Sequence, residues 1–244
     1  MEQWGITDCG KVREHNQDVF KILYDEEKSI SVLMVCDGVG GAKAGNIASS
    51  LAAEVFMHQI GKYIENIGSI KETAEKMAEA VSAANRVVYE KSMREDDYAG
   101  MGTTLTAAIS TPFGEVIVNI GDSRVYHVTL SKITQVTRDH TVIEDMITRG
   151  DISRAEARRH PNKHLITRAL GSSRNESPDV FFLCLQDGEH ILLCSDGLTD
   201  VVFDSEILFQ LQHGRSVREC CENLIEMALS RGAPDNVTVV IFRK

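Results

Sequence analysis

The sequence lacks an excess of basic residues, a membrane-length apolar run and any Cys-x-x-Cys pair. Its formal net charge is −10, and no basic stripe with interleaved aromatic residues occurs, which argues against nucleic acid as the main partner. No apolar stretch is long enough to cross a bilayer, and the first residues are not typical of a signal peptide. We therefore expect a cytoplasmic monomer that binds neither nucleic acid nor membrane.

The six cysteines also exclude common site types. Because none lies in a Cys-x-x-Cys pair, a zinc site is not expected. Four lie in strand-like runs and two on an apolar helix face, which predicts small core residues in a reducing compartment. The chain of 244 residues has no linker, internal repeat or low-complexity segment, so we expect one domain over residues 1–244.

Apolar periodicity predicts three long helices. The first has an apolar face from Ile47 to Ile64, the second runs from about Ile70 to Met93, and the third covers 216–231. Ser216 and Glu219 form a capping box at the start of the third helix. A shorter helix is predicted near residues 204–212.

Apolar or alternating runs predict strands along the rest of the chain. The predicted strands are 2–9, 18–23, 32–36, 103–111, 115–120, 125–130, 133–137, 179–185, 189–194 and 237–242. Short turns between consecutive strands predict antiparallel pairing, with a meander over 103–137 and a hairpin around Asp187-Gly188.

The order of these elements lacks the strict alternation of strands and helices that a parallel sheet requires. It favours an α+β fold, a four-layer αββα sandwich with two central antiparallel sheets and a helix pair on each outer face. Residues 139–176 differ from the rest and are predicted to form a helical flap insertion.

Five aspartates stand at the ends of predicted strands. Asp37 ends the most apolar run and precedes a glycine-rich turn, Asp122 and Asp196 follow two other strands, Asp235 precedes the last strand, and Asp18 begins one. A single such acid usually caps a turn. Five that converge need a compensating charge, and hard divalent cations with oxygen ligands supply it most cheaply.

Two groups of basic residues have open interpretations. Arg13 lies shortly before Asp18, where its guanidinium could pair with that acid or bind an anion that the metals also hold. The flap is locally basic through Arg149, Arg154, Arg158, Arg159, Lys163 and Arg168. It is either a solvated insertion or a surface that meets a phosphorylated substrate. His160 and His164 are interpreted as surface residues of the flap rather than zinc ligands.

Several known motifs are absent. Gly61-Lys62 is followed by Tyr63 and therefore does not form a P-loop. The turn after Asp37 lacks the third glycine of a dinucleotide fingerprint. No nucleophile elbow and no His-Glu-x-x-His motif occurs. An aspartyl-phosphate phosphatase would need a second acid two residues after the first, where this chain has Val39.

Six motifs occur in a specific order along the chain. They are Arg13-x-x-Asn16-Gln17-Asp18, Val35-Cys36-Asp37-Gly38-Val39-Gly40-Gly41, Gly102-Thr103-Thr104, Gly121-Asp122-Ser123-Arg124, Cys194-Ser195-Asp196-Gly197-Leu198-Thr199-Asp200 and Asp235-Asn236-Val237-Thr238. Together they closely resemble the metal-dependent protein phosphatases of type 2C, and most of all the compact bacterial branch. The resemblance extends over residues 2–243 and implies the same sandwich fold.

The resemblance also implies a metal centre. Asp37 would bridge two Mn²⁺ or Mg²⁺ ions, and the Gly38 carbonyl, Asp196 and Asp235 would supply further ligands. Asp18 would act through a bound water. Asp122 would help to hold a third, weaker metal beside Asp196.

The implied activity is hydrolysis of phosphoserine and phosphothreonine in proteins, opposing a cognate Ser/Thr kinase. A metal-bridging hydroxide would attack phosphorus directly, with Arg13 binding the phosphate. Val39 and Ala42 replace histidines found in parts of the family, so we assign no protein general acid and expect a water on the Asp122 ion in that role. The alternatives are a phosphatase dedicated to one phosphorylated regulator, as in sigma-factor switches, and an inactive binding scaffold.

Overall fold

The strand β3 (Ile30–Val39) is buried along most of its length and packs on both faces. Because successive side chains in a strand point to opposite faces, Leu33 and Val35 join one core cluster, whereas Met34 and Cys36 join another. The first cluster lies between two sheets and the second lies between one sheet and its helices. A strand that is apolar on both faces therefore has to lie in the interior of a layered structure.

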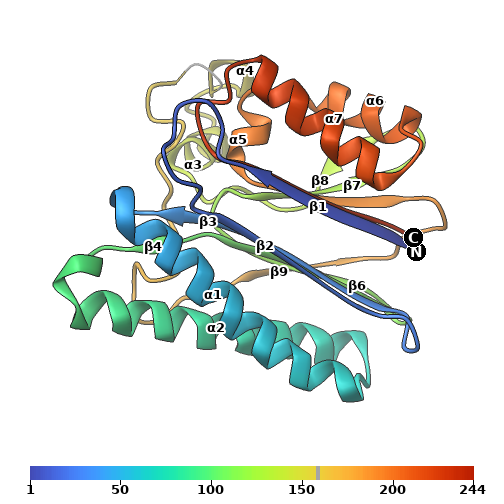
Figure 1. Ribbon diagram of the computed structural model, residues 1–244, viewed down its shortest axis with the longest axis horizontal. Coiled ribbons are helices and arrows are strands. Elements are labelled where there is room, and N and C mark those ends of the chain that lie inside the picture. Colours follow the sequence, from blue (N-terminus) through green and yellow to red (C-terminus); the bar gives the residue numbers. More distant parts are fainter. Residues whose placement is uncertain (158–159) are drawn as a thin grey trace.

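The computed structural model describes residues 1–157 and 160–244 and contains two antiparallel sheets (Figure 1). The five-stranded sheet has the order β1-β11-β10-β7-β8, and the six-stranded sheet has the order β2-β3-β5-β6-β9 with β4 paired to β3. The strands besides β3 are β1 (Glu2–Asp8), β2 (Asp18–Asp25), β4 (Gly102–Thr103), β5 (Leu105–Thr111), β6 (Gly114–Ile120), β7 (Arg124–Val128), β8 (Ile133–Gln135), β9 (Asp179–Leu183), β10 (His190–Cys194) and β11 (Val237–Arg243).

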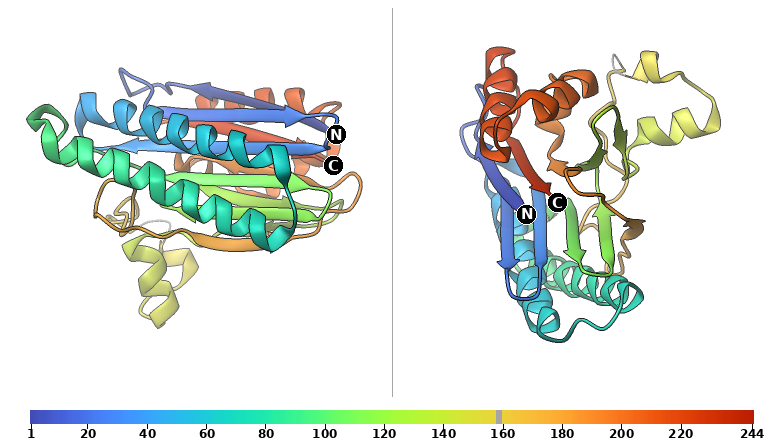
Figure 2. Two further views of the ribbon diagram at one scale, coloured as in Figure 1. Left: turned by 90° about the horizontal axis from the view of Figure 1, so that it is seen from below. Right: turned by 90° about the vertical axis from the view of Figure 1, so that its right-hand side faces the viewer.

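A helix pair covers the outer face of each sheet. The helices α1 (Gly41–Tyr63) and α2 (Ile70–Arg94) lie on the six-stranded sheet, and α6 (Asp204–His213) and α7 (Val217–Ser230) lie on the five-stranded sheet (Figures 1 and 2). Short 3₁₀ turns follow the first pair, η1 (Ile64–Asn66) and η2 (Asp96–Tyr98). The predicted four-layer sandwich is confirmed.

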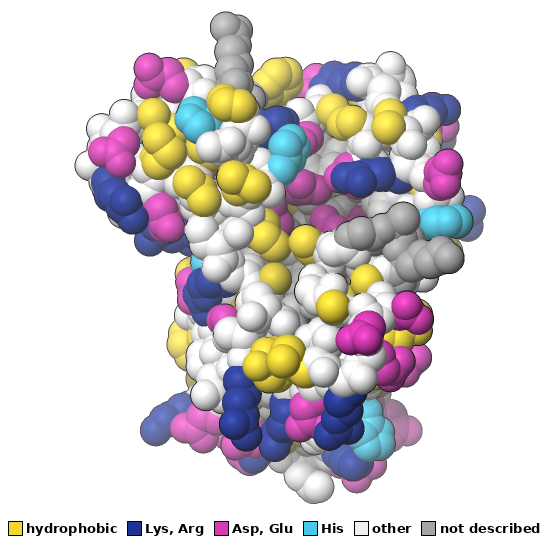
Figure 3. Space-filling view, turned by 90° about the vertical axis from the view of Figure 1, so that its left-hand side faces the viewer, with side chains coloured by type: hydrophobic (Ala, Val, Ile, Leu, Met, Phe, Trp, Pro, Cys, Tyr) yellow, Lys and Arg dark blue, Asp and Glu magenta, His cyan; other side chains and the backbone are white. Residues whose placement is uncertain are grey.

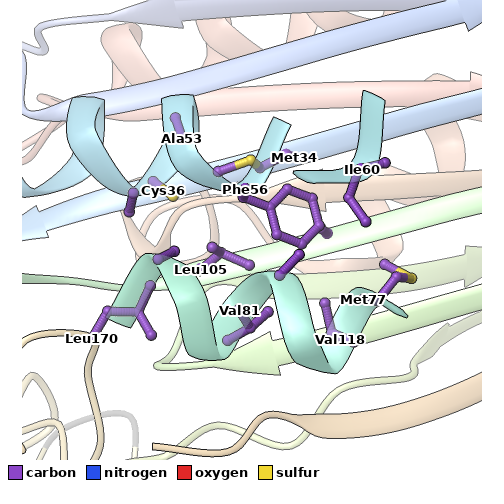
Figure 4. Packing of buried hydrophobic residues seen from close by; sticks show 14 of the residues in the cluster. Met34, Cys36, Ala53, Phe56, Ile60, Met77, Val81, Leu105, Val118 and Leu170 are labelled. Carbon is purple, nitrogen blue, oxygen red and sulfur yellow. The ribbon is translucent and has the colours of Figure 1, made fainter. Parts of the chain in front are cut away.

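The core under the first helix pair is filled by interlocking side chains from all its elements. Phe56 of α1 lies between Met34 of the sheet and Val81 and Met77 of α2 (Figure 4), and all four are fully buried. Burial of such side chains stabilises each by roughly 1.5–3 kcal/mol. The helix pair therefore holds β3, and with it Asp37, in a fixed position.

The flap projects from the side of the sandwich (Figure 2). It contains α3 (Val142–Arg149) and α4 (Arg154–Ala157). Its two ends are joined where the Val142 N–H donates to the Leu165 carbonyl at 2.9 Å. Arg158 and Arg159, two of the basic residues predicted for the flap, lie outside the described residues.

Two predicted strand pairings are wrong. The strands β6 and β7 lie in different sheets, as do β9 and β10. Gly121, with φ 108°, turns the chain from one sheet to the other, and a Cβ there would lie 2.4 Å from the Thr104 side chain. The error has a physical reason, since both sheets present apolar residues to the same central core and alternation alone does not reveal which sheet the next strand joins.

The first helix begins earlier than its apolar face predicts. It starts at Gly41 rather than near Ile47, because Gly40 adopts φ 109° and turns the chain directly from β3 into the helix. Two cysteines also differ from the prediction of buried core residues. Cys184 is exposed and Cys9 is half-buried.

Candidate active site

The strand-end aspartates converge at one end of the sandwich. Asp18 is directly opposite Asp37 in the pairing of β2 with β3. Asp122 lies in the turn after β6, and Asp196 begins the short helix α5 (Asp196–Thr199) that follows β10. Asp235 lies two residues before β11, the neighbour of β10. Each of the two sheets, and the turn that connects them, therefore contributes at least one of these acids.

A cleft of about 780 Å³ opens between these strand ends. Its lining includes Asp37, Asp122, Asp196 and Asp235, together with Arg13. Figure 3 faces this end of the molecule, where acidic side chains gather in a hollow between the two halves of the sandwich. Asp18 lies behind the cleft and is 5% exposed. The structure thus brings together all five predicted acids.

The backbone around Asp37 is fixed by close contacts. Its N–H donates to Thr104 Oγ1 at 2.9 Å, and its carbonyl accepts from Thr103 Oγ1 at 2.8 Å. A Cβ on Gly38 would lie 2.3 Å from the Gly45 carbonyl oxygen, so the first turn of α1 can approach the strand only where glycine stands. The glycine after Asp37 therefore serves close packing as well as the turn.

Burial and mutual repulsion raise the pKa values of three of the clustered acids, Asp18, Asp37 and Asp122. Burial is the main cause for Asp37, whose pKa lies well above its usual range, and the charge of Asp18 raises it further. Burial raises the pKa of Asp18 to about 7, although hydrogen bonds from Thr238 and Ser195, at 2.6 and 2.7 Å, oppose this shift. The pKa of Asp122 is raised by burial and then by Asp196.

The donor set fits divalent cations. Asp18 Oδ1 and Asp196 Oδ1 are buried and accept no hydrogen bond from the described residues. A buried, partnerless carboxylate oxygen is costly, and a hard cation satisfies it without a proton. Aspartates, a backbone carbonyl and water are the oxygen ligands that such ions prefer.

Arg13 pairs with a different acid from the one predicted. Its Nη2 donates to Asp235 Oδ2 at 2.7 Å, so the alternative of a pair with Asp18 is wrong. This hydrogen bond and the Asp235 charge raise the pKa of Arg13. The Arg13 side chain remains 56% exposed at the cleft, and among the described residues its only hydrogen-bond acceptor is Asp235. Binding of an anion by Arg13 stays a prediction.

A single buried side chain joins the Arg13 loop to the last strand. Asn236 is 4% exposed. Its Nδ2 donates to the carbonyls of Cys9 and His15 at 2.9 and 3.1 Å, and its Oδ1 accepts from the Gln17 N–H at 2.8 Å. These bonds position Arg13 beside the adjacent Asp235.

Sequence reasoning missed the role of two flap residues. Lys163 Nζ lies 3.0 Å from Asp200 Oδ1, and His164 Nδ1 lies 3.6 Å from oxygens of both Asp196 and Asp200. The nearby carboxylates of Asp196 and Asp200 raise the pKa of His164. The ligand atoms of His164, Asp196 and Asp200 all lie within 4.8 Å of one another, so they could hold a metal ion. His164 is exposed, as predicted, but its position beside Asp196 and Asp200 was not predicted, because no local spacing signals it.

Sequence reasoning also missed His140, which lies at the base of the flap. It is 8% exposed, and its Nδ1 accepts from the Gly121 N–H at 3.0 Å. Because Nδ1 accepts this bond it carries no proton, so in the neutral imidazole Nε2 carries the proton and donates to Asp179 Oδ2 at 3.1 Å. Burial lowers the pKa of His140, which favours this neutral form. His140 thereby fixes the backbone next to Asp122.

Comparisons with known proteins agree with this geometry. The family model of protein phosphatase 2C matches residues 7–233. The serine/threonine phosphatase stp of Listeria innocua is 33% identical over 98% of this chain and 94% of its own length. The serine/threonine protein phosphatase PstP of Mycobacterium tuberculosis is 37% identical over 96% of this chain, which spans 43% of PstP.

A solved structure extends the comparison to three dimensions. The catalytic domain of PstP, in complex with two manganese ions, matches with a TM-score of 0.85 and 36% identity over 98% of this chain and 96% of that one. The αββα sandwich with strand-end acids is the architecture of a phosphatase class. The chain belongs to the protein phosphatase 2C family, as its motifs predict. In the described residues, no helix is both long and apolar enough to span a membrane.

Loss of His140 is expected to impair the site without unfolding the protein. His140→Ala removes the acceptor for the Gly121 N–H, and supporting residues of this kind typically contribute about 10–100-fold to metal affinity or activity. We expect a reduction in that range for phosphatase activity in a manganese titration. His140→Asn, whose Oδ1 can replace Nδ1, should restore part of it. The exposed His58→Ala is the control, and equal activity in His140→Ala and His58→Ala would contradict the role.

The raised pKa values predict how the stability of the metal-free protein depends on pH. Asp18 titrates at about 7 in the folded chain but near about 3.9 when unfolded. Its contribution to the free energy of unfolding is therefore complete below about pH 4 and is lost as pH rises to about 7. The melting temperature of chelator-treated protein should fall between about pH 4 and about pH 7, and Asp18→Asn should lessen the fall. Glu226→Gln, at an exposed site, is the control, and an unchanged fall in Asp18→Asn would refute the assignment.

Proposed function

We propose that this chain is a metal-dependent protein phosphatase that hydrolyses phosphoserine and phosphothreonine esters. The observation that supports it most directly is the convergence of five aspartates at one cleft beside Arg13, namely Asp18, Asp37, Asp122, Asp196 and Asp235. The pKa values of Asp18, Asp37 and Asp122 are raised, and Asp18 and Asp196 each have a buried oxygen without a hydrogen-bond partner among the described residues. The names of its relatives point to the same activity. An inactive scaffold is disfavoured because every expected acid is present.

The proposed ligand set follows from the position of each group. Asp37 stands centrally and would bridge two divalent cations, Mn²⁺ or Mg²⁺, with the Gly38 carbonyl, Asp196 and Asp235 beside it. Asp18 lies behind the cleft and would act through water. Asp122 would serve a third site next to Asp196, where His164 and Asp200 also lie. When bound, the cations supply Lewis-acid charge and a water nucleophile that is reactive at neutral pH.

The chain's own residues then act on the substrate. Hydrolysis consumes one water, breaks the bond between phosphorus and the serine or threonine oxygen, and releases an alcohol and inorganic phosphate. Arg13 would bind the phosphate oxygens with the N–H groups that Asp235 does not use, and the Asp235 bond holds its guanidinium in place beforehand. The buried Asn236 keeps this loop close to the cleft.

The position two residues after Asp37, where parts of the family have a histidine that could protonate the leaving alcohol, has none in this sequence. Val39 occupies that position and lines the cleft. Of Ala42, only the helical backbone is described. Protonation by a water near Asp122 therefore remains our proposal. In the cell, the substrates would be phosphoproteins and the opposing enzyme a cognate Ser/Thr kinase, with a cytoplasmic monomer as the working form.

Turnover with added metal tests the proposed function. The protein should hydrolyse a phosphothreonine peptide and p-nitrophenyl phosphate when Mn²⁺ or Mg²⁺ is present, and a chelator should stop both reactions. Asp37→Asn should reduce kcat by at least about 10²–10³-fold, since the central charge is lost. Asp187→Asn, an exposed turn residue, should retain full activity. Absence of turnover at saturating manganese would exclude an active phosphatase.

Substitution of Arg13 separates phosphate binding from support of the metal centre. Arg13→Ala should raise KM for the phosphopeptide roughly 10- to 100-fold, the value expected for one or two charged hydrogen bonds. Manganese affinity measured by calorimetry should change little. The control is Lys11→Ala in the same loop. If Arg13→Ala instead lowers manganese affinity and leaves KM unchanged, Arg13 mainly supports Asp235.

A further inference from the structure

A second concave surface lies beside α2, apart from the active-site cleft. It is a groove of about 700 Å³ between the C-terminal half of α2 and residues 174–177. Figures 1 and 2 show this segment, which lies at the C-terminal end of the flap and precedes β9, running along the C-terminal part of the helix. We call it the α2 groove, and its lining includes Arg86, Tyr89, Arg94 and Arg174.

The α2 groove has an excess of positive charge that the protein itself does not neutralise. Of its acids, Glu90 already pairs with Arg94 at 3.0 Å, and Glu176 accepts from Ser173 Oγ at 2.8 Å. Arg86 and Arg174 are exposed, and within residues 1–157 and 160–244 neither forms an ion pair. On a chain with net charge −10, two unpaired guanidinium groups in one hollow form a local site for anions.

The wall of the groove is held rigidly by a buried amide. Asn85 of α2 is 1% exposed. Its Nδ2 donates to the carbonyls of Ser173 and Arg174 at 3.1 and 3.2 Å, and its Oδ1 accepts from the Gly171 N–H at 2.8 Å. Three hydrogen bonds from one buried side chain fix the backbone that bears Arg174. A preorganised wall lowers the entropy that binding would otherwise cost.

The same wall is joined to the active site through Arg168. Its guanidinium lies 3.6 Å from Glu176 and 2.8 Å from Asp179, and it also donates to the Ser177 carbonyl. Asp179 in turn accepts from His140, which fixes the turn before Asp122. The α2 groove therefore keeps a constant position relative to the catalytic cleft.

We propose that the α2 groove binds an acidic segment of the phosphoprotein substrate, at a distance in sequence from the phosphorylated residue. This inference rests on the proposed phosphatase function. Carboxylates of the segment would pair with Arg86 and Arg174, whose planar guanidinium groups suit bidentate binding. Tethering at the groove raises the effective concentration of the phosphoresidue at the cleft. It would select substrates by charge without any change in the chemistry.

Matched peptides test the proposal. Each contains phosphothreonine, a spacer of about 4 to 12 residues that spans roughly 13 to 40 Å when extended, and a tail of either aspartates or asparagines. At low salt the aspartate tail should lower KM about 3- to 10-fold at the best spacer, the effect of two exposed ion pairs. Arg86→Glu/Arg174→Glu should abolish this advantage while turnover of p-nitrophenyl phosphate stays unchanged. Circular dichroism checks the fold, with Arg86→Ala/Arg174→Ala as the milder variant.

A charge-matched control separates the groove from general attraction. Arg215 and Lys132 are exposed and lie on the side of the other sheet, so Arg215→Glu/Lys132→Glu should keep the tail advantage. The proposal is overturned if the aspartate tail does not lower KM for the wild type. It is also overturned if the tail still lowers KM for the groove variant, or if the control variant loses the effect equally. Anisotropy of the unphosphorylated aspartate tail provides a readout without turnover. Binding that depends on Arg86 and Arg174 supports the groove even if no phosphoester is hydrolysed, a result that would reject only the proposed function.

Discussion

Repulsion between buried carboxylates is the constraint on which this structure depends. Asp18 and Asp37 face each other across a pair of strands, and burial places both in surroundings that penalise a negative charge. Apolar packing cannot relieve this cost, because apolar surroundings are what disfavour the charged carboxylate. Relief has to come from a proton or from a cation, and only the cation leaves the carboxylates charged at neutral pH. A scaffold selected for stability alone would place apolar residues there.

The surrounding layers keep those acids from moving apart. The pair α1 and α2 buries one face of β3, which carries Asp37 near its end, while Thr103 and Thr104 fix the peptide groups of Asp37. On the opposite side, Ser195 and Thr238 direct their hydroxyls to Asp18. Such polar contacts at a buried site are stronger than in water and define one geometry. The rigid support explains why a site rich in like charges remains compact.

Much of this arrangement was predictable from local patterns. The apolar runs that end in aspartate, the helical periodicity and the Ser216 cap, which accepts from the Glu219 N–H at 3.2 Å, all act over a few residues. Interactions across the fold were not predictable in this way. The pair between Arg13 and Asp235, the approach of His164 to Asp196 and the contact of His140 with Gly121 join segments distant in sequence. The sheets to which β7 and β10 belong were also predicted wrongly, because both sheets contribute apolar side chains to one central core.

The turn at Gly121 has a mechanical consequence. It carries the chain from the six-stranded sheet to the five-stranded sheet, and the acids flanking the cleft come from both sides of that junction. An ion held by Asp37 of one sheet and by Asp196, which follows a strand of the other, would cross-link the two sheets. Sliding of one sheet over the other would then be resisted at the end of the sandwich that contains the cleft, so the same ion would serve both catalysis and the stability of the two-sheet packing.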